Sequence, residues 1–255
     1  MTLTGRRIVV TGGASGMGAA MVRDFVREGA AVVSLDRDEA SNAEVARSVE
    51  GPGRATPMAC DVTDRASVEQ AFATATTALG GLDALVHAAG IAPGAPADAI
   101  TLELWEEVFA VNSRGTFLTN VAAFPYLKDK GGRILNFSSG AGIRGYPGKA
   151  AYAAAKGAVL AWVRSIAVEW APYRITVNAI SPAIWTPMYE KTRSLMTPQQ
   201  LETHERFIAE RIPLGGRLGD PDRDFAPVMR FLVGEGSAFL TGQTFAIDGG
   251  MTMVR

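Results

Sequence analysis

The chain has 255 residues, and its 25 lysines and arginines against 26 aspartates and glutamates leave a formal net charge of −1, which excludes the basic field that holds nucleic acid or an anionic membrane surface. Its 47% hydrophobic and 20% charged residues are typical of a soluble globular protein and exclude the disordered and fibrous classes. A single cysteine, Cys60, and two histidines argue against a disulfide framework and a metal centre, so we expect a cytoplasmic protein without a metal site.

Short runs rich in β-branched residues alternate along the chain with stretches of helical periodicity. The runs predict seven strands, at 7–10, 31–35, 55–60, 82–87, 133–137, 175–180 and 244–247. The stretches between them predict helices at 17–27, 39–49, 65–79, 102–127, 152–170 and 222–233. Apolar strands joined by helices favour a parallel sheet covered on both faces. We therefore predict a doubly wound, Rossmann-type α/β fold that forms one domain over residues 1–255.

One region, residues 184–219, is not needed for that sheet. It contains a Thr-Pro turn, a predicted helix at 198–211 and a Gly-Gly turn. Such an excursion forms the lid or wall of a pocket, or is a plain surface insertion. Elsewhere, the longest apolar stretch, 150–163, is interrupted by Lys156, and the apolar run after Arg7 is too short for a secretory signal. We expect that the protein neither spans a membrane nor is exported.

The first predicted strand runs into a glycine-rich turn at 11–18 and then directly into a helix. Glycines permit the tight turn and the close approach of a pyrophosphate, and the helix N-terminus supplies N–H groups. Gly12, Gly16 and Gly18 are spaced Gly-x3-Gly-x-Gly, which differs from the more common G-x-G-x-x-G. The turn predicts a dinucleotide-binding loop formed by Gly12, Ser15, Gly16, Met17 and Gly18.

Two charged residues follow the second predicted strand, and the first of them lies eighteen residues beyond Gly18. At about that distance a carboxylate, here Asp36, accepts a hydrogen bond from the adenosine ribose 2′-OH and repels the 2′-phosphate of NADP. Arg37 beside it is able to pair with that phosphate instead. The sequence favours NAD and leaves NADP open.

Tyr152 and Lys156 are four residues apart at the start of a predicted helix and therefore share one helix face. A lysine charge within a few ångströms lowers the pKa of a phenol, which would make Tyr152 a proton acceptor from an alcohol and a donor to a ketone. Ser139 follows the fifth predicted strand, at the sheet edge where ligands bind, and is placed to hold the reacting oxygen. Asn112 is placed to organise a water behind Lys156, or is a buried amide satisfied by backbone.

These motifs occur together in an order that resembles the short-chain dehydrogenase/reductase family, in its compact classical type. The matching segments cover nearly the whole chain: the glycine-rich turn, Cys60-Asp61-Val62-Thr63-Asp64, His87-Ala88-Ala89-Gly90, Asn112, Ser138-Ser139, Tyr152-Ala153-Ala154-Ala155-Lys156, Asn178-Ala179-Ile180-Ser181-Pro182 with Thr186, and Leu240-Thr241-Gly242-Gln243 to Asp248-Gly249-Gly250.

The resemblance implies roles for individual residues. Ser139 is implied to orient the substrate oxygen, Tyr152 to be the general acid and base, and Lys156 to lower its pKa and bind the nicotinamide ribose. Asn112 is implied to maintain a proton-relay water. The resemblance further implies a homotetramer, and cofactor contacts at Asp61, Val62, Ala88, Ala89, Gly90, Pro182, Ile184 and Thr186.

Several positions depart from the family pattern. His87 and Ala88 stand where the family usually has two asparagines, so side-chain amide support is missing there while backbone contacts remain. We interpret His87 as a structural histidine because the acid/base role is already filled. Ala155 replaces a usual serine and Ala183 a usual glycine. The second change removes the backbone freedom of glycine from the loop that leads toward the nicotinamide.

The residues expected around the substrate are mostly apolar and aromatic, and they are Ser139, Ile143, Tyr146, Trp185, Met188 and Tyr189. They predict a hydrophobic secondary alcohol or ketone as the substrate. Arg144, in the same stretch, is a contact for an acidic substrate group or an exposed loop charge. The expected function is an NAD(H)-dependent oxidoreductase that interconverts an alcohol and a ketone.

Three alternatives remain open at this stage. The first is an NADP(H)-dependent reductase of 3-oxoacyl thioesters, and the second is a regulatory protein that binds a dinucleotide without turnover. The third is another Rossmann-type enzyme, such as a methyltransferase or a nucleotide-sugar epimerase. Ser139, Tyr152 and Lys156 argue against the first of these, and the small C-terminal region argues against the second. The fold alone does not separate these classes.

Overall fold

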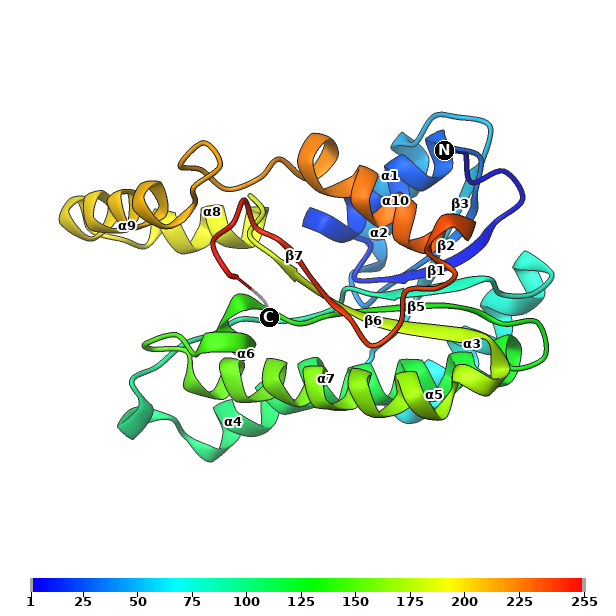
Figure 1. Ribbon diagram of the computed structural model, residues 1–255, viewed down its shortest axis with the longest axis horizontal. Coiled ribbons are helices and arrows are strands. Elements are labelled where there is room, and N and C mark those ends of the chain that lie inside the picture. Colours follow the sequence, from blue (N-terminus) through cyan, green and yellow to red (C-terminus); the bar gives the residue numbers. More distant parts are fainter. Residues whose placement is uncertain (1, 254–255) are drawn as a thin grey trace.

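A computed structural model describes residues 2–253 of the chain. Seven parallel strands form one sheet in the order β3-β2-β1-β4-β5-β6-β7 (Figure 1). Their bounds are β1 Arg7–Thr11, β2 Ala31–Asp36, β3 Arg54–Ala59, β4 Ala84–His87, β5 Gly132–Phe137, β6 Ile175–Pro182 and β7 Thr244–Ile247. The predicted Rossmann-type fold class is confirmed, and each predicted strand is present with its ends shifted by at most two residues.

Helices cover both faces of this sheet (Figure 1). One face carries α1 Gly16–Arg27, α2 Glu39–Ser48 and α10 Ala226–Val233. The other carries α3 Arg65–Leu79, α5 Gly115–Leu127 and α7 Ala150–Glu169. Alternate residues of β1 enter the two apolar cores, because Ile8 and Val10 pack with α1 and α10 while Val9 packs with the helices of the opposite face. Burial on both faces explains why the strands read as continuous apolar runs.

Shorter helical segments join these elements. They are α4 Leu102–Phe109, α6 Gly140–Arg144, three 3-10 turns (Ala97–Ala99, Ala171–Tyr173 and Glu235–Ser237) and two π-helical turns (Ala110–Arg114 and Pro221–Phe225). The prediction of one continuous helix over 102–127 was wrong in detail, because a π-helical turn separates α4 from α5. The Asn112 side chain lies in that turn and donates to the carbonyls of Val108 and Ile91, at 3.0 and 2.9 Å.

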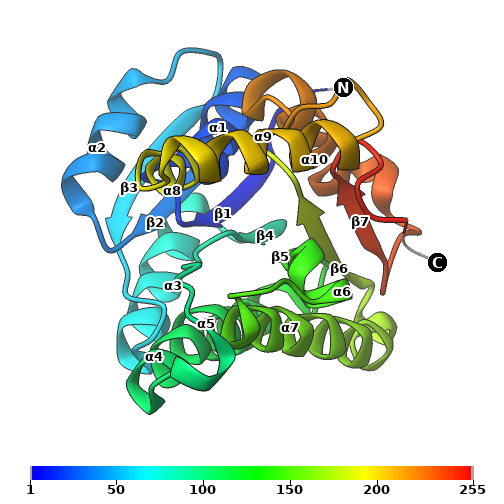
Figure 2. The ribbon, with the colours of Figure 1, turned by 90° about the vertical axis from the view of Figure 1, so that its left-hand side faces the viewer.

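The excursion after β6 leaves and rejoins the body of the protein at one point. Trp185 N–H donates to the Gly219 carbonyl at 2.9 Å, and Gly219 N–H donates to the Ala183 carbonyl at 3.0 Å. Between these bonds lie α8 Pro187–Ser194, which the sequence analysis missed, and α9 Pro198–Arg211, which coincides with its prediction. Neither helix contains a buried residue. Figure 2 looks onto the sheet edge and shows both helices in front of it, across from α4 and α7.

One helix, α7, is long and apolar enough to cross a membrane by length and composition alone. In this fold it packs against α6, β5 and β6 instead, and its residues Val159, Val163 and Ile166 belong to the main core. The helix also carries Lys156 inward, 4% exposed. This arrangement is that of a core helix.

Candidate active site

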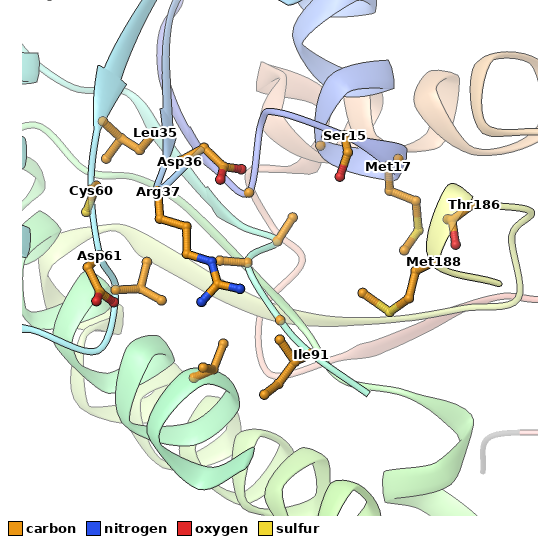
Figure 3. A pocket seen from close by; sticks show the side chains of 18 of the residues that line it. Ser15, Met17, Leu35, Asp36, Arg37, Cys60, Asp61, Ile91, Thr186 and Met188 are labelled. Carbon is orange, nitrogen blue, oxygen red and sulfur yellow. The ribbon is translucent and has the colours of Figure 1, made fainter. Parts of the chain in front are cut away.

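A groove crosses the carboxyl edge of the sheet between the loops that follow β1, β2 and β4. This is the point where the strand order reverses, since β1 lies between β2 and β4, and open α/β sheets bind ligands there. Figure 3 shows Asp36, Arg37 and Asp61 on one side of the groove and Ser15, Met17, Thr186 and Met188 on the other. The groove therefore collects residues from both halves of the sheet.

The glycine-rich turn is packed too closely for side chains at two positions. A Cβ on Gly18 would lie 1.9 Å from the Gly12 carbonyl oxygen, and Gly12 itself has φ +72° with the Ala89 amide nitrogen 2.8 Å from its Cβ position. The α1 helix begins at Gly16, and the Ser15 side chain makes no capping bond to it. The first N–H groups of α1 thus face the groove, an arrangement that fits a pyrophosphate.

Asp36 ends β2 and is held by backbone. Its Oδ2 accepts from Ala14 N–H and its Oδ1 accepts from Asp38 N–H, both at 3.0 Å. The Arg37 side chain extends further into the groove, toward Ile91 (Figure 3). Hydrogen bonds from Thr63 lower the pKa of the Asp61 carboxyl, and the Arg37 charge adds to this lowering. A carboxylate and a guanidinium are therefore both present where an adenosine ribose would lie.

All the predicted cofactor residues line this groove or the cavity that continues it. The groove is lined by Gly12, Ser15, Gly16, Met17, Gly18, Asp36, Arg37, Asp61, Val62, Ala88, Ala89, Gly90 and Thr186, and the continuing cavity adds Pro182, Ile184, Tyr152 and Lys156. The sequence analysis did not assign Leu35, Cys60, Ile91 and Val111 to the cofactor; Cys60 begins a matching segment, whereas the other three apolar side chains belong to no motif. Burial raises the pKa of the Cys60 thiol to about 11, so this cysteine is protonated and inert.

The continuing cavity contains all four predicted catalytic residues, Asn112, Ser139, Tyr152 and Lys156. Lys156 Nζ donates to the Phe137 carbonyl at 2.8 Å and lies 5.8 Å from the centre of the Tyr152 ring. Ser139 ends the strand-to-helix turn after β5, where its Oγ accepts from Ala141 N–H at 3.1 Å and caps α6. The fold thus brings together four residues, from the π-helical turn Ala110–Arg114, the N-cap of α6 and the helix α7.

The electrostatics of this centre differ from the expectation in one respect. Burial raises the pKa of the Tyr152 phenol, and a side-chain hydrogen bond with Ser139 opposes the rise. The same burial lowers the pKa of Lys156 to about 7, so the lysine is only partly charged at neutral pH. In the chain by itself the pKa of the phenol is therefore raised, because loss of hydration outweighs the hydrogen bond with Ser139. The lowering of this pKa by Lys156 stays a prediction.

Asn112 is fully buried, and only one end of its side-chain amide is hydrogen-bonded. Its amide nitrogen donates to two carbonyls, whereas its Oδ1 has no hydrogen-bond partner within residues 2–253. A Cβ on Gly90 would lie 2.8 Å from this oxygen and 3.4 Å from Lys156 Nζ. The oxygen and the ammonium therefore both border the space at Gly90, and an unpaired buried acceptor of this kind fits an ordered water.

His87, at the end of β4, has the surroundings of a structural side chain. Its Nδ1 lies 2.9 Å from Thr11 Oγ1 and 3.0 Å from Thr119 Oγ1, and the ring is 1% exposed. Burial, with a contribution from the Lys156 charge, lowers the pKa of His87 to about 3. The imidazole is neutral at physiological pH, which agrees with its interpretation as a structural histidine.

A second cavity adjoins the reaction centre, and Ser139, Tyr152 and Pro182 line both. Of the residues expected around the substrate, Met188 and Tyr189 line the cavity that continues the groove, Tyr146 lines the second cavity, and Ser139 lines both. Ile143 and Trp185 line neither of these cavities. Ile143 packs against the main core. Trp185 packs edge-on against Tyr189, with ring centres 5.1 Å apart, and the Arg193 guanidinium lies over the Trp185 ring.

The second cavity also contains residues that the sequence analysis did not assign to it. They are Ala141, Lys149, Ser181, Ala183, Asp248, Met251 and Thr252. Arg144, which was weighed as a contact for an acidic substrate group or as an exposed loop charge, lines the cavity too. Ser181, Asp248 and Thr252 come from parts of the chain far from Ser139, where no local pattern connects them. Ala183 does not adopt a positive φ, and its N–H donates to the Ile247 carbonyl at 2.9 Å. No three His, Cys, Asp or Glu side chains within residues 2–253 are grouped so as to hold a metal ion.

Comparison with known proteins gives a consistent match across the chain. A family model described as enoyl-(acyl carrier protein) reductase matches residues 12–252. The chain is 37% identical to the 3-oxoacyl-[acyl-carrier-protein] reductase FabG of Thermotoga maritima, over 99% of this chain and all of that protein. It is 36% identical to 2-(S)-hydroxypropyl-CoM dehydrogenase 3 of Xanthobacter autotrophicus, over 97% of this chain and 96% of that protein.

Among solved structures, the fold is similar to a 3-ketoacyl-(acyl-carrier-protein) reductase from Brucella melitensis complexed with NADH. The TM-score is 0.87, the identity is 31%, and the match covers 99% of this chain and all of that one. The crystal structure of levodione reductase matches with the same TM-score at 32% identity, over 97% of both chains. The similarity thus includes the whole length of the protein and not the dinucleotide groove alone.

Proposed function

The chain belongs to the short-chain dehydrogenase/reductase family, and from this premise we propose that it interconverts a secondary alcohol and a ketone with NAD(H), using Tyr152 as general acid and base. As a member of this family it is an oxidoreductase acting on CH–OH groups. The observation that carries the proposal is the meeting of Ser139, Tyr152 and Lys156 in a cavity that continues the dinucleotide groove. A regulatory protein without turnover would not need that meeting.

Each residue has a role that follows from its position. The Ser139 hydroxyl holds the reacting oxygen, and the Tyr152 phenol takes the proton of an alcohol or returns it to a ketone. A bound nicotinamide dinucleotide supplies the hydride acceptor or donor. Lys156 would bind the ribose of that dinucleotide and lies beside the phenol ring, and the unpaired Asn112 Oδ1 would hold a water that exchanges the proton with solvent. The chain's own residues therefore account for orientation and for the path of the proton.

The choice of NAD rests on Asp36. Its carboxylate lies at the end of β2, and two backbone N–H groups hold it in place. A carboxylate oxygen has a second lone pair, so Asp36 accepts from the ribose 2′-OH as well, whereas a 2′-phosphate there would meet a like charge.

The second candidate is an NADP(H)-dependent reductase of 3-oxoacyl thioesters. The 37% identity to a 3-oxoacyl-[acyl-carrier-protein] reductase over 99% of the chain favours it, and so does the Arg37 side chain that extends into the groove. Both candidates share the same reaction centre and differ in the cofactor and in what is attached to the ketone. We place the NAD(H) reaction first because Asp36 is the last residue of β2, whereas Arg37 lies in the loop after it.

The proposal also includes the substrate class, the compartment and the oligomeric state. The aromatic and apolar side chains of Tyr146, Met188 and Tyr189 around the reaction centre suit a small alcohol or ketone with hydrophobic surface. We further propose a cytoplasmic homotetramer. Exposed aromatic side chains on α5, which a partner subunit would cover, support the assembly.

The test replaces Tyr152 with phenylalanine and measures turnover on a panel of secondary alcohols and ketones by the absorbance of the reduced nicotinamide. General acid and base catalysis contributes roughly 10²–10⁴-fold, so Tyr152→Phe should lose at least about a hundredfold in kcat. NADH affinity, measured by fluorescence titration, should stay near the wild-type value. Tyr173→Phe, a phenol exposed far from the cavity, is the matched control. Wild-type turnover in Tyr152→Phe would show that the assigned acid and base is wrong.

A further inference from the structure

Two basic side chains line the second cavity, and neither has an acidic partner. Arg144 and Lys149 form no ion pair within residues 2–253, whereas nine other arginines there do. Lys149 is partly buried, and its Nζ donates to the Ala92 carbonyl. Burial lowers the pKa of Lys149, and no nearby carboxylate raises it. Arg144 is exposed, whereas Lys149 is intermediate in burial. A partly buried cation such as Lys149 is costly without a counter-ion in a folded chain unless a ligand supplies the opposite charge.

Short rigid segments connect these cations to the reacting residues. Arg144 ends the helix α6 that Ser139 caps, and Lys149 precedes Tyr152 by three residues at the start of α7. Lys149 is the N-cap of α7, and it lines the same cavity as Tyr152. Ser139 and Arg144 thus belong to α6 and its N-cap, and Tyr152 and Lys149 to α7 and its N-cap. A single small molecule is able to reach both the reacting residues and the cations.

Two hydroxyl groups in the wall of the same cavity also lack partners. Ser181 Oγ and Thr252 Oγ1 are buried, with their residues 1% and 6% exposed, and neither bonds to any group within residues 2–253. A Cβ built on Gly140 would lie 3.3 Å from Thr252 Oγ1 and 3.9 Å from Arg144 Nη2. A hydroxyl and a guanidinium thus converge beside the residue that follows Ser139. Unpaired buried hydroxyls lose free energy that a ligand oxygen recovers.

One carboxylate, Asp248, also lines the cavity and must be counted. Its Oδ1 accepts from Gly250 N–H at 3.0 Å, and it lies beyond ion-pair distance of both cations. Two positive charges therefore face one negative charge that the backbone already holds. The balance of the lining is basic, in a protein whose overall formal charge is −1.

We propose that the second cavity binds a carboxylate of the substrate through Arg144 and Lys149, so that the substrate is a short hydroxy acid or its oxo acid. This inference rests on the proposed reaction and sharpens the substrate class expected for it. Ser139 and Tyr152 receive the carbinol or ketone oxygen, while the acid group lies on the far side, over Gly140. The guanidinium offers a planar pair of donors and Lys149 a single charge, a combination that suits a carboxylate.

The test compares short 2-, 3- and 4-oxo acids with their methyl esters, which keep the ketone and lose the charge. Wild type should prefer at least one acid over its ester by about tenfold or more in kcat/KM, mainly through KM, since a charged hydrogen bond is worth about that factor. Arg144→Gln and Lys149→Gln should each lose about tenfold on that acid and leave its ester nearly unchanged. Glutamine keeps a donor for the Ala92 carbonyl. Arg47→Gln, which removes an exposed charge on α2, is the matched control.

A binding measurement separates failure of this inference from failure of the proposed reaction. Butanoate, an unreactive carboxylate, should bind to the NADH complex in calorimetry, and Arg144→Gln should weaken it by about tenfold. If neutral ketones turn over through Tyr152 while no acid is preferred and butanoate does not bind, the carboxylate site is wrong and the reaction stands. If butanoate binds through Arg144 while Tyr152→Phe changes no turnover, the site stands and the assigned reaction is wrong.

Discussion

At the scale of single residues, burial acts on Tyr152 and Lys156 in opposite directions. It raises the pKa of the phenol and lowers that of the lysine to about 7, so both side chains are drawn toward their neutral forms in the chain by itself. A neutral phenol is a proton donor to a ketone, whereas an acceptor of an alcohol proton needs additional positive charge nearby. The proposed reaction therefore depends on what the groove binds as well as on this pair.

The buried lysine should reduce stability in a pH-dependent manner. The pKa of Lys156 is about 7 in the fold against an ordinary 10.5, so the unfolded chain binds more protons between these values and stability rises with pH across them. Lys156→Met, although inactive, should be about 1–3 kcal/mol more stable than wild type at pH 6, and the difference should shrink toward pH 10. Urea unfolding at several pH values measures it, with the exposed Lys128→Met as control. A difference that is constant with pH would contradict the prediction.

Asp36 should determine the choice of cofactor through its charge. Asp36→Asn keeps an acceptor for Ala14 N–H and removes the charge, and Asp36→Ala removes both. Either change should raise kcat/KM for NADP⁺ by about tenfold or more, since one like-charge contact is lifted, while NAD⁺ turnover falls. Arg37→Gln should lower the NADP⁺ activity of these variants. Unchanged rejection of NADP⁺ in Asp36→Ala would remove Asp36 from the explanation.

At the scale of elements, the π-helical turn at Ala110–Arg114 has a local cause and a long-range result. Asn112 bonds to the Val108 carbonyl within its own segment and to the Ile91 carbonyl after β4. The turn thereby fixes the α4–α5 segment to the loop that lines the groove. Such a one-turn widening occurs often at functional sites, and here it aims Asn112 Oδ1 at Gly90.

The helices α8 and α9 should be the least stable part of the fold. They contain no buried residue, and packing between Tyr146 and Phe207, with ring centres 6.3 Å apart, is among their few contacts with the body. Trypsin should therefore cleave first after Lys191, Arg193, Arg206 or Arg211. Because Thr186, Pro187 and Met188 line the groove, NADH should slow these cuts by about tenfold, the factor that about 1.4 kcal/mol of added protection gives.

Arg164 on the packed helix α7 provides the internal control for this experiment, since it should stay uncut with and without NADH. Mass spectrometry of the earliest fragments identifies the sites. First cleavage within α7, or cleavage of α8 and α9 at a rate that NADH does not alter, would show that this segment is docked independently of the groove.

At the scale of the whole molecule, a groove between α3 and α5 exposes apolar surface. Phe117, Val121 and Tyr126 are 45%, 43% and 40% exposed beside the buried Val68 and Phe72. A patch of this kind on two long helices suits a partner subunit, in line with the expected homotetramer.

The assembly should be sensitive to charge in that groove. Wild type should sediment as a tetramer in analytical ultracentrifugation, and Val121→Asp should shift it to smaller species with an unchanged circular dichroism spectrum. A buried unpaired carboxylate costs several kcal/mol in an interface, which is enough to dissociate it. Leu195→Asp, at a position that is 79% exposed on the excursion, should leave the tetramer intact. A monomeric wild type would contradict the assembly.

Local patterns predicted much of this molecule. The period of apolar residues located every strand and most helices, and the glycine spacing, Asp36 and the Tyr152-Lys156 pair located the groove and the reaction centre in order along the chain. The helix α8 was missed although its signal was present, since Thr186 caps it and Pro187 starts it. These features are local because periodicity, capping and turns depend on residues within a few positions of one another.

Other features depended on contacts between distant segments. The pKa values of Tyr152 and Lys156 reflect how much water the packed helices remove, which no spacing reveals. Arg144, Lys149, Ser181 and Thr252 meet only because β5, β6 and the chain after β7 end at the same sheet edge. The sequence by itself thus determined the fold class, the family and the residues of the proposed chemistry. The tertiary structure alone decided their electrostatics and the charge of the substrate cavity, because burial and the pairing of remote side chains are properties of the packed chain.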